Sequence, residues 1–106
     1  MKIVFCSLAL LISSMNVAAA SITSKVTKVG CHIDRNMCFV YIEAPIQSSC
    51  SLNDNSLRWD GVNGRNVKSA LAILLAAKTA GQKVTFGGVG DVCYGDYPTF
   101  KWVRNN

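Results

Sequence analysis

Apolar residues recur every three or four positions from Val67 to Ala80, and this spacing predicts a helix. Asn66 precedes the segment, where its side chain can cap the helix by accepting backbone N–H groups of the first turn. Gly81 follows as a C-terminal stop, and Lys78 lies near the negative end of the helix dipole. The stripe expected to face the core consists of Val67, Ala70, Leu71, Leu74 and Leu75.

A second stripe of the same helix is largely apolar as well, but its side chains are mostly small. Small side chains let another backbone approach closely, which favours a contact between subunits of a homo-oligomer. Alanine is also the best helix former and tolerates exposure, so a plain solvent face is the alternative. The predicted interface residues are Ser69, Ala72, Ile73, Ala76 and Ala80.

Alternating or β-branched and aromatic segments predict five strands around this helix. They are expected at residues 21–29, 37–44, 57–60, 83–88 and 99–103. The order β-β-β-α-β-β in so short a chain favours a mainly β fold with one helix, built as a small OB-like five-stranded barrel. An α+β sheet with the helix on one face is the alternative. Trp59 and Phe86 are expected in the core.

The first twenty residues have the features of a secretory signal peptide. Lys2 provides a basic start, an apolar run extends from Ile3 to about Leu11, and Ala18 and Ala20 fit an A-x-A cleavage site. The apolar run is too short to span a bilayer. We therefore expect a signal peptide at residues 1–20, cleaved after about Ala20, and a single domain at residues 21–106. The expected location is secreted or periplasmic, with no membrane span after processing.

Cleavage would leave four of the five cysteines and lower the formal net charge from +5 to +4, because Lys2 is lost. An even number of cysteines in a short exported chain points to disulfides. Three pairings are possible. We favour Cys31–Cys38, which flank a polar turn between two strands, and this leaves Cys50–Cys93. None of the spacings is the tight C-x2-C pair of a zinc site, so no metal is expected.

Candidate catalytic groups are few. His32 is the only histidine, and the carboxylates form no recognisable pair for acid–base catalysis. The glycines in "GGVGDVCYG" suggest a phosphate loop, but no helix follows them, so a bulge and a turn are favoured. We expect no enzymatic activity and no cofactor.

Ligand-binding groups gather on loops that a rigid scaffold holds in place. Tyr94, Asp96 and Tyr97 in "CYGDYP" adjoin a predicted disulfide and are the candidate ligand-binding residues. The alternative is that they are turn residues, with Tyr97 packing on the barrel. Basic residues are spread along the chain without a cluster, so they are expected to be solvated, and nucleic acid is not expected as a partner.

The segments "YIEAPIQSSCSLNDNSLRWD", "NVKSALAILLAAKTAGQKVTF" and "GDVC" combine a strand, a cysteine, a tryptophan, an alanine-rich helix, a strand and a second cysteine. This layout, over roughly residues 26–103, resembles short exported bacterial proteins. It is similar to the B subunits of AB-type toxins, such as that of subtilase cytotoxin, which have an OB fold. The resemblance implies a secreted, non-enzymatic module that assembles into a ring and binds cell-surface glycans.

Two functions remain open on these grounds. The first is a secreted binding module, oligomeric, with a cell-surface glycan or a partner protein as its target. The second is a monomeric periplasmic or secreted accessory protein, inhibitory or structural, that binds no glycan.

Overall fold

The computed structural model describes residues 20–90 and 92–106, so residues 1–19 of the predicted signal peptide lie outside the described residues. In these ranges the strands and helix are β1 Ala20–Cys31, β2 Cys38–Ile42, β3 Ser56–Trp59, α2 Val67–Ala80, β4 Lys83–Val89, β5 Cys93–Tyr94, β6 Tyr97–Pro98 and β7 Trp102–Asn105. The described part of the chain contains no helix long and apolar enough to cross a membrane.

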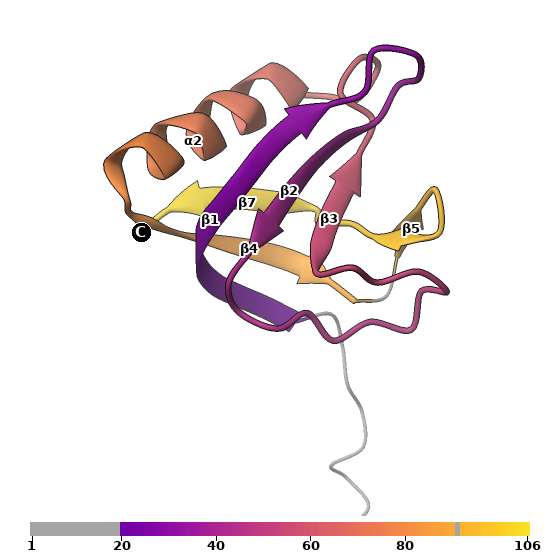
Figure 1. Cartoon of the computed structure of the whole chain (residues 1–106), viewed down its shortest axis with the longest axis horizontal. Coiled ribbons are helices and arrows are strands. Elements are labelled where there is room, and N and C mark those ends of the chain that lie inside the picture. The colour runs from indigo at the N-terminus through magenta and orange to yellow at the C-terminus, as the bar shows by residue number, and fades with distance from the viewer. Residues whose placement is uncertain (1–19, 91) are drawn as a thin grey trace, which may run out of the picture.

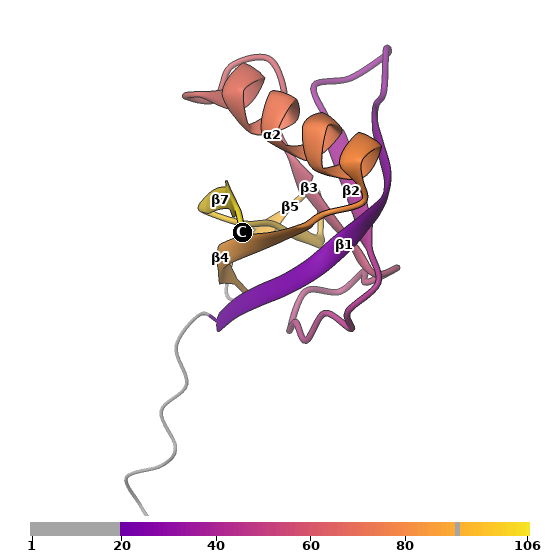
Figure 2. The same ribbon diagram turned by 90° about the vertical axis from the view of Figure 1, so that its left-hand side faces the viewer.

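Five strands form one antiparallel sheet in the order β3-β2-β1-β4-β7, and β5 pairs with β6 in a separate hairpin. The long strand β1 joins the two halves of the sheet, because its N-terminal half pairs with β4 and its C-terminal half with β2. Figure 1 shows that β1 curves strongly between these two partners. Figure 2 shows α2 lying across the curved sheet, where it contacts β1, β4 and β7.

The mainly β fold with one helix is confirmed, but the strands of the expected five-stranded barrel do not close, because the sheet is open. Among the described residues, β3 and β7 are its two edges and do not pair with each other. Side chains rather than backbone hydrogen bonds connect the two ends of the sheet. The ring of Phe100 lies edge-on to Trp59 of β3 and Phe86 of β4, with centroid distances of 5.3 and 5.2 Å.

The core lies between α2 and the inner face of the curved sheet. Alternate residues of a strand share a face, and Val40 of β2, Leu57 of β3 and Phe86 of β4 are fully buried, as is Leu74 of α2. Trp59 is only 7% exposed. The predicted burial of Trp59 and Phe86 is therefore confirmed.

The bounds of the helix agree with the prediction, but its N-terminal cap does not. Asn66 has a left-handed backbone with φ 53°, and its side chain makes no capping hydrogen bond. The C-terminal stop is confirmed: Gly81 has φ 69°, and the Gln82 N–H donates to the Ala77 carbonyl over 2.9 Å. These are the contacts of a glycine-terminated helix.

The buried side of the helix is rotated relative to the predicted stripe. Leu74 and Ala77 are buried, whereas Leu75 is 46% exposed. The reason is that α2 lies across the curved sheet and contacts β1, β4 and β7 at once. Its buried surface therefore extends to Ala77, outside the stripe that spacing alone indicated.

Both predicted disulfides are confirmed. Cys31 and Cys38 are opposite each other on β1 and β2, with a Cα–Cα distance of 3.9 Å, which is shorter than the usual range of about 4.4–6.8 Å. Cys50 and Cys93 connect the loop before β3 to the β5–β6 hairpin, with a Cα–Cα distance of 5.8 Å. Disulfides of this kind are typical of extracellular or periplasmic proteins.

The glycines after the helix form a bulge, as predicted. The register of β1 against β4 shifts between Ala20 and Ile22, which face Val89 and Phe86. The extra residue lies on β4, where Gly88 has φ 72°. Glycine is needed here because this backbone conformation is unfavourable for other residues.

Candidate functional site

The outer face of β1, β2 and β3 carries aromatic and basic side chains. Because residues alternate along a strand, the buried Val40 of β2 is flanked by Phe39 and Tyr41, which point to the other face and are half-buried. Lys28 of β1 is the register partner of Tyr41, and its Nζ atom lies 5.3 Å from the centroid of that ring.

Arg58 is the centre of this face. It lies on β3 and is only 6% exposed, so the expectation of a solvated charge is wrong for this residue. Its guanidinium carbon lies 4.1 Å from the centroid of the Tyr97 ring, and 5.2 and 5.8 Å from those of Phe39 and Tyr41. A planar, weakly hydrated guanidinium is suited to such stacking. We call Lys28, Phe39, Tyr41, Asp54, Arg58 and Tyr97 the Arg58 cluster.

Hydrogen bonds satisfy the buried guanidinium. Its Nε donates to the Ser56 hydroxyl over 2.8 Å, and one Nη2 donates to Asp54 over 3.0 Å and to the Tyr41 hydroxyl over 3.2 Å. The Asp54 carboxylate also accepts hydrogen bonds from the hydroxyls of Tyr41 and Ser56. The positive charge is thus paired with one carboxylate, as a buried charge requires.

The network shifts two pKa values. Burial by itself raises the pKa of Asp54, but hydrogen bonds from Ser56 and Tyr41 and the nearby Arg58 charge outweigh it, so this pKa lies below its usual range. The hydrogen bond to Asp54 raises the pKa of the Tyr41 phenol. At neutral pH the network therefore contains an ionised carboxylate, a neutral phenol and a guanidinium.

The three predicted ligand residues lie on the β5–β6 hairpin, beside the Arg58 cluster. Tyr97 covers the guanidinium of Arg58. Tyr94 donates its hydroxyl to the carbonyl of Asn36 over 2.6 Å, which attaches the hairpin to the β1–β2 loop. Asp96 is exposed at the tip, with φ 72°. Tyr97 therefore does pack on the sheet, as the alternative interpretation expected.

The helix stripe predicted as an oligomer interface is only partly on the surface. Ser69, Ala72, Ala76 and Ala80 are exposed, but Ile73 is half-buried and packs against the core. The exposed face of α2 therefore contains these four small residues together with Leu75, Lys68, Lys78 and Thr79. The interface itself stays a prediction.

Comparison of the chain with protein-family models, with curated proteins and with solved structures finds no match in any of the three. Among the described residues, no three His, Cys, Asp or Glu side chains gather closely enough to hold a metal ion. The candidate site is an aromatic and basic face that the β5–β6 hairpin covers at one side and that two disulfides adjoin.

Proposed function

We propose that this chain is a secreted, non-enzymatic binding module that recognises a carbohydrate through the Arg58 cluster and the adjoining β5–β6 hairpin. The observation that carries the proposal is the set of three aromatic rings around Arg58, with Phe39 and Tyr41 on the outer face of β2 and Tyr97 on the hairpin. Half-buried rings offer flat apolar surfaces to a sugar ring. The Tyr97 hydroxyl and the exposed Asp96 carboxylate supply hydrogen-bonding groups for sugar hydroxyls.

The strand order supports this choice of surface. In an OB fold, a partly open five-stranded barrel, oligosaccharides and oligonucleotides bind to the face of strands 2 and 3 and to the loops after strands 1 and 4. In this chain the corresponding elements are β2, β3, the loop between β1 and β2, and the segment between β4 and β7 that carries the hairpin. The similarity in layout to toxin B subunits points the same way. The disulfides favour export. Of oligosaccharides and oligonucleotides, an oligosaccharide is therefore the better candidate ligand.

Charge indicates the class of glycan. The ammonium group of Lys28 lies over the Tyr41 ring, and Arg35 is exposed on the β1–β2 loop. The formal net charge is +5 for the whole chain and would be +4 after the predicted cleavage removes Lys2. These cations favour a glycan that carries carboxylate or sulfate groups, because long-range attraction raises its local concentration.

The test is binding of the oxidised protein to an array of neutral and acidic glycans. Tyr97→Ala should weaken binding by about tenfold or more, since a central aromatic contact is lost. Lys28→Gln should weaken binding to acidic glycans only. Trp102→Ala changes an aromatic residue that is 47% exposed on β7, outside this surface, and should bind like the wild type. The proposal fails if the wild type binds no glycan, or if folded Tyr97→Ala and Lys28→Gln proteins bind as it does.

We further propose that the exposed face of α2 joins copies of the chain into an oligomer. Ala72 and Ala76 are small and exposed, and Leu75 beside them leaves nearly half of an apolar side chain in water. Small residues permit close approach of a second helix, and covering Leu75 adds apolar burial.

Ala76→Glu should therefore dissociate the oligomer, because it places an unpaired charge in the contact while glutamate keeps a high helix propensity. The expected weakening is at least about tenfold in the dissociation constant. Light scattering during size-exclusion chromatography measures it. Gln47→Glu introduces the same charge at an exposed loop position and is the matched control. A wild type that stays monomeric at high concentration would contradict the oligomer and favour the monomeric accessory protein.

A further inference from the structure

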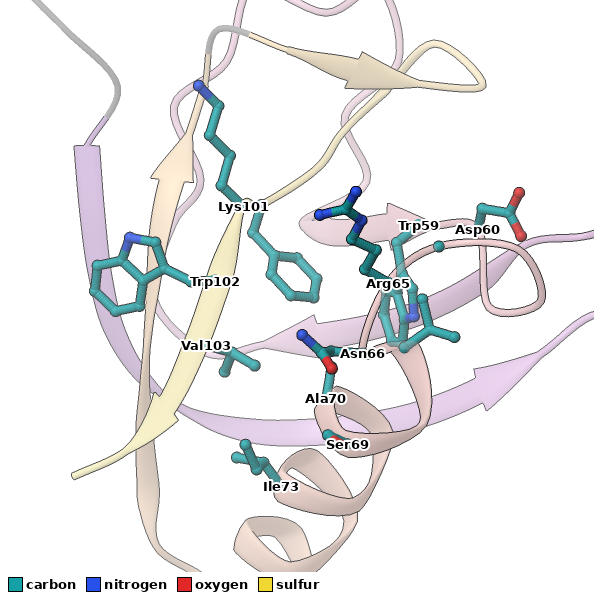
Figure 3. A pocket seen from close by; sticks show the side chains of 13 residues that line it. Trp59, Asp60, Arg65, Asn66, Ser69, Ala70, Ile73, Lys101, Trp102 and Val103 are labelled. Carbon is teal, nitrogen blue, oxygen red and sulfur yellow. The ribbon is translucent and has the colours of Figure 1, made fainter.

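A cavity of about 510 Å3 lies between the start of α2, the end of β3 and the segment leading into β7. Figure 3 shows its lining side chains, which come from these elements, from the turn between β3 and α2, and from β7 itself. It occupies the region where the open sheet leaves β3 and β7 unpaired. Its apolar walls come from Trp59, Ile73, Phe100, Trp102 and Val103. Both the volume and the lining are those of a small-ligand site, for which about 300–1,000 Å3 is usual.

One of the residues that line the cavity, Trp59, contains an unpaired polar atom. Trp59 is 7% exposed, and its indole Nε1–H is buried with no hydrogen-bond partner among the described residues. Buried donors are normally paired, so an unpaired one next to a cavity needs an explanation. An acceptor atom of a bound molecule would provide the missing partner.

The same cavity receives the positive end of α2. Val67, Ser69 and Ala70 of its first turn line the cavity, and this turn has no side-chain cap and no acidic residue. The N–H groups of a first helical turn lack partners within the helix, and they favour an anion. The basic residues Arg65 and Lys101 line the cavity as well.

Asp60, the acidic residue that lines the cavity, repels a bound anion only weakly. One carboxylate oxygen of Asp60 accepts the backbone N–H groups of Val62 and Asn63 over 2.8 and 2.9 Å. These bonds lower the pKa of Asp60 and hold its carboxylate in the turn before the helix. Figure 3 shows the Asp60 side chain directed away from Ile73 and Trp102.

We propose that this cavity binds a small organic carboxylate with an apolar or aromatic body. The body packs on Phe100, Ile73 and Val103, and the carboxylate lies at the start of α2 with Arg65 and Lys101. One carboxylate oxygen accepts the Nε1–H of Trp59, which requires a local side-chain shift because that nitrogen is buried, and the exposed Arg65 side chain pairs with the same carboxylate. This site uses the inner side of β3 and is independent of the proposed carbohydrate face.

The test is a titration of the oxidised, 15N-labelled protein with naphthalene-2-carboxylate, followed by the indole N–H resonances in NMR spectra. The chain has two tryptophans, Trp59 and Trp102, and Trp59→Phe assigns their signals. We expect a saturable downfield shift of the Trp59 signal. The uncharged analogue 2-naphthalenemethanol should bind about tenfold more weakly or worse, since it lacks the charge. The proposal is wrong if the carboxylate leaves both indole signals unmoved, or if the alcohol binds equally well.

Variants distinguish specific binding in this cavity from nonspecific binding elsewhere on the protein. Trp59→Phe keeps an aromatic ring but removes the N–H, and should lower the affinity about tenfold. Arg65→Gln alters an exposed side chain, so the fold should be retained while the affinity falls several-fold. Lys28→Gln removes a cation outside the cavity and should change nothing. Unchanged affinity in folded Trp59→Phe and Arg65→Gln proteins would overturn the proposal.

Discussion

Replacing Trp59 by alanine should lower the free energy of unfolding by about 3–5 kcal/mol. The side chain is 7% exposed and packs edge-on against Phe100, with ring centroids 5.3 Å apart. It belongs to the same buried cluster as Leu57 and Phe86. A domain this small has little other core to compensate for the lost contacts. Urea unfolding of the oxidised protein measures the change.

Two variants show whether burial is the cause. Trp59→Phe retains most of the apolar ring and removes an unpaired buried donor, so it should cost far less than Trp59→Ala. Trp102→Ala removes the same side chain from a position that is 47% exposed, and should also cost much less. If Trp59→Ala unfolds at the same urea concentration as the wild type, the core assignment is contradicted.

The features that could be predicted from the sequence are those set by local pattern. The helix bounds follow from apolar spacing and from Gly81, whose left-handed backbone ends the helix. The disulfides could be paired because Cys31 and Cys38 flank a short turn, which leaves one partner each for Cys50 and Cys93. Four of the five predicted strands overlap the observed ones closely, and the last begins at Trp102 rather than at residue 99.

The structural features that the sequence did not predict depend on tertiary packing. The side chain of Asn66 was expected to cap the helix, but its backbone is left-handed at the turn before the helix. Ala77 became buried instead of Leu75 because the curved sheet contacts the helix from three strands. Whether the sheet closes does not follow from local sequence patterns, because closure depends on pairing between β3 and β7. These strands are 43 residues apart along the chain, from Trp59 to Trp102.

The candidate site was predicted only at its periphery. Tyr94, Asp96 and Tyr97 were chosen for their place beside a cysteine, and Tyr97 does lie on Arg58. Arg58 itself looked like any solvated cation, because its burial comes from a hairpin that follows it by about 40 residues. One local signal was available: Asp54 and Arg58 are four residues apart and form an ion pair of 3.0 Å.

Replacing Arg58 by alanine should lower the free energy of unfolding by about 2–4 kcal/mol, somewhat less than breaking a fully buried ion pair. The substitution removes the stacking partner of Tyr97 and four hydrogen bonds, which go to Ser56, Asp54, Tyr41 and the sulfur of Met37. Asp54 retains 41% side-chain exposure and can be hydrated, which limits the cost. Arg58→Lys should recover only part of the loss, because an ammonium group cannot reproduce the planar fork.

The dependence of this loss on pH tests the ion pair separately from the packing. Because the pKa of Asp54 is lower in the folded protein than in the unfolded chain, its contribution to stability is present above the unfolded value of about 3.9. It disappears as the pH falls through the folded pKa. The difference in unfolding free energy between wild type and Asp54→Asn should therefore shrink between about pH 5 and pH 2. Asp60 also has a lowered pKa, but it lies in another turn. Asp60→Asn is therefore the matched control: Arg58→Ala should cost as much stability in the Asp60→Asn protein as it does in the wild type. If the Asp54→Asn difference is the same at both ends of this range, Asp54 does not stabilise the fold through its charge.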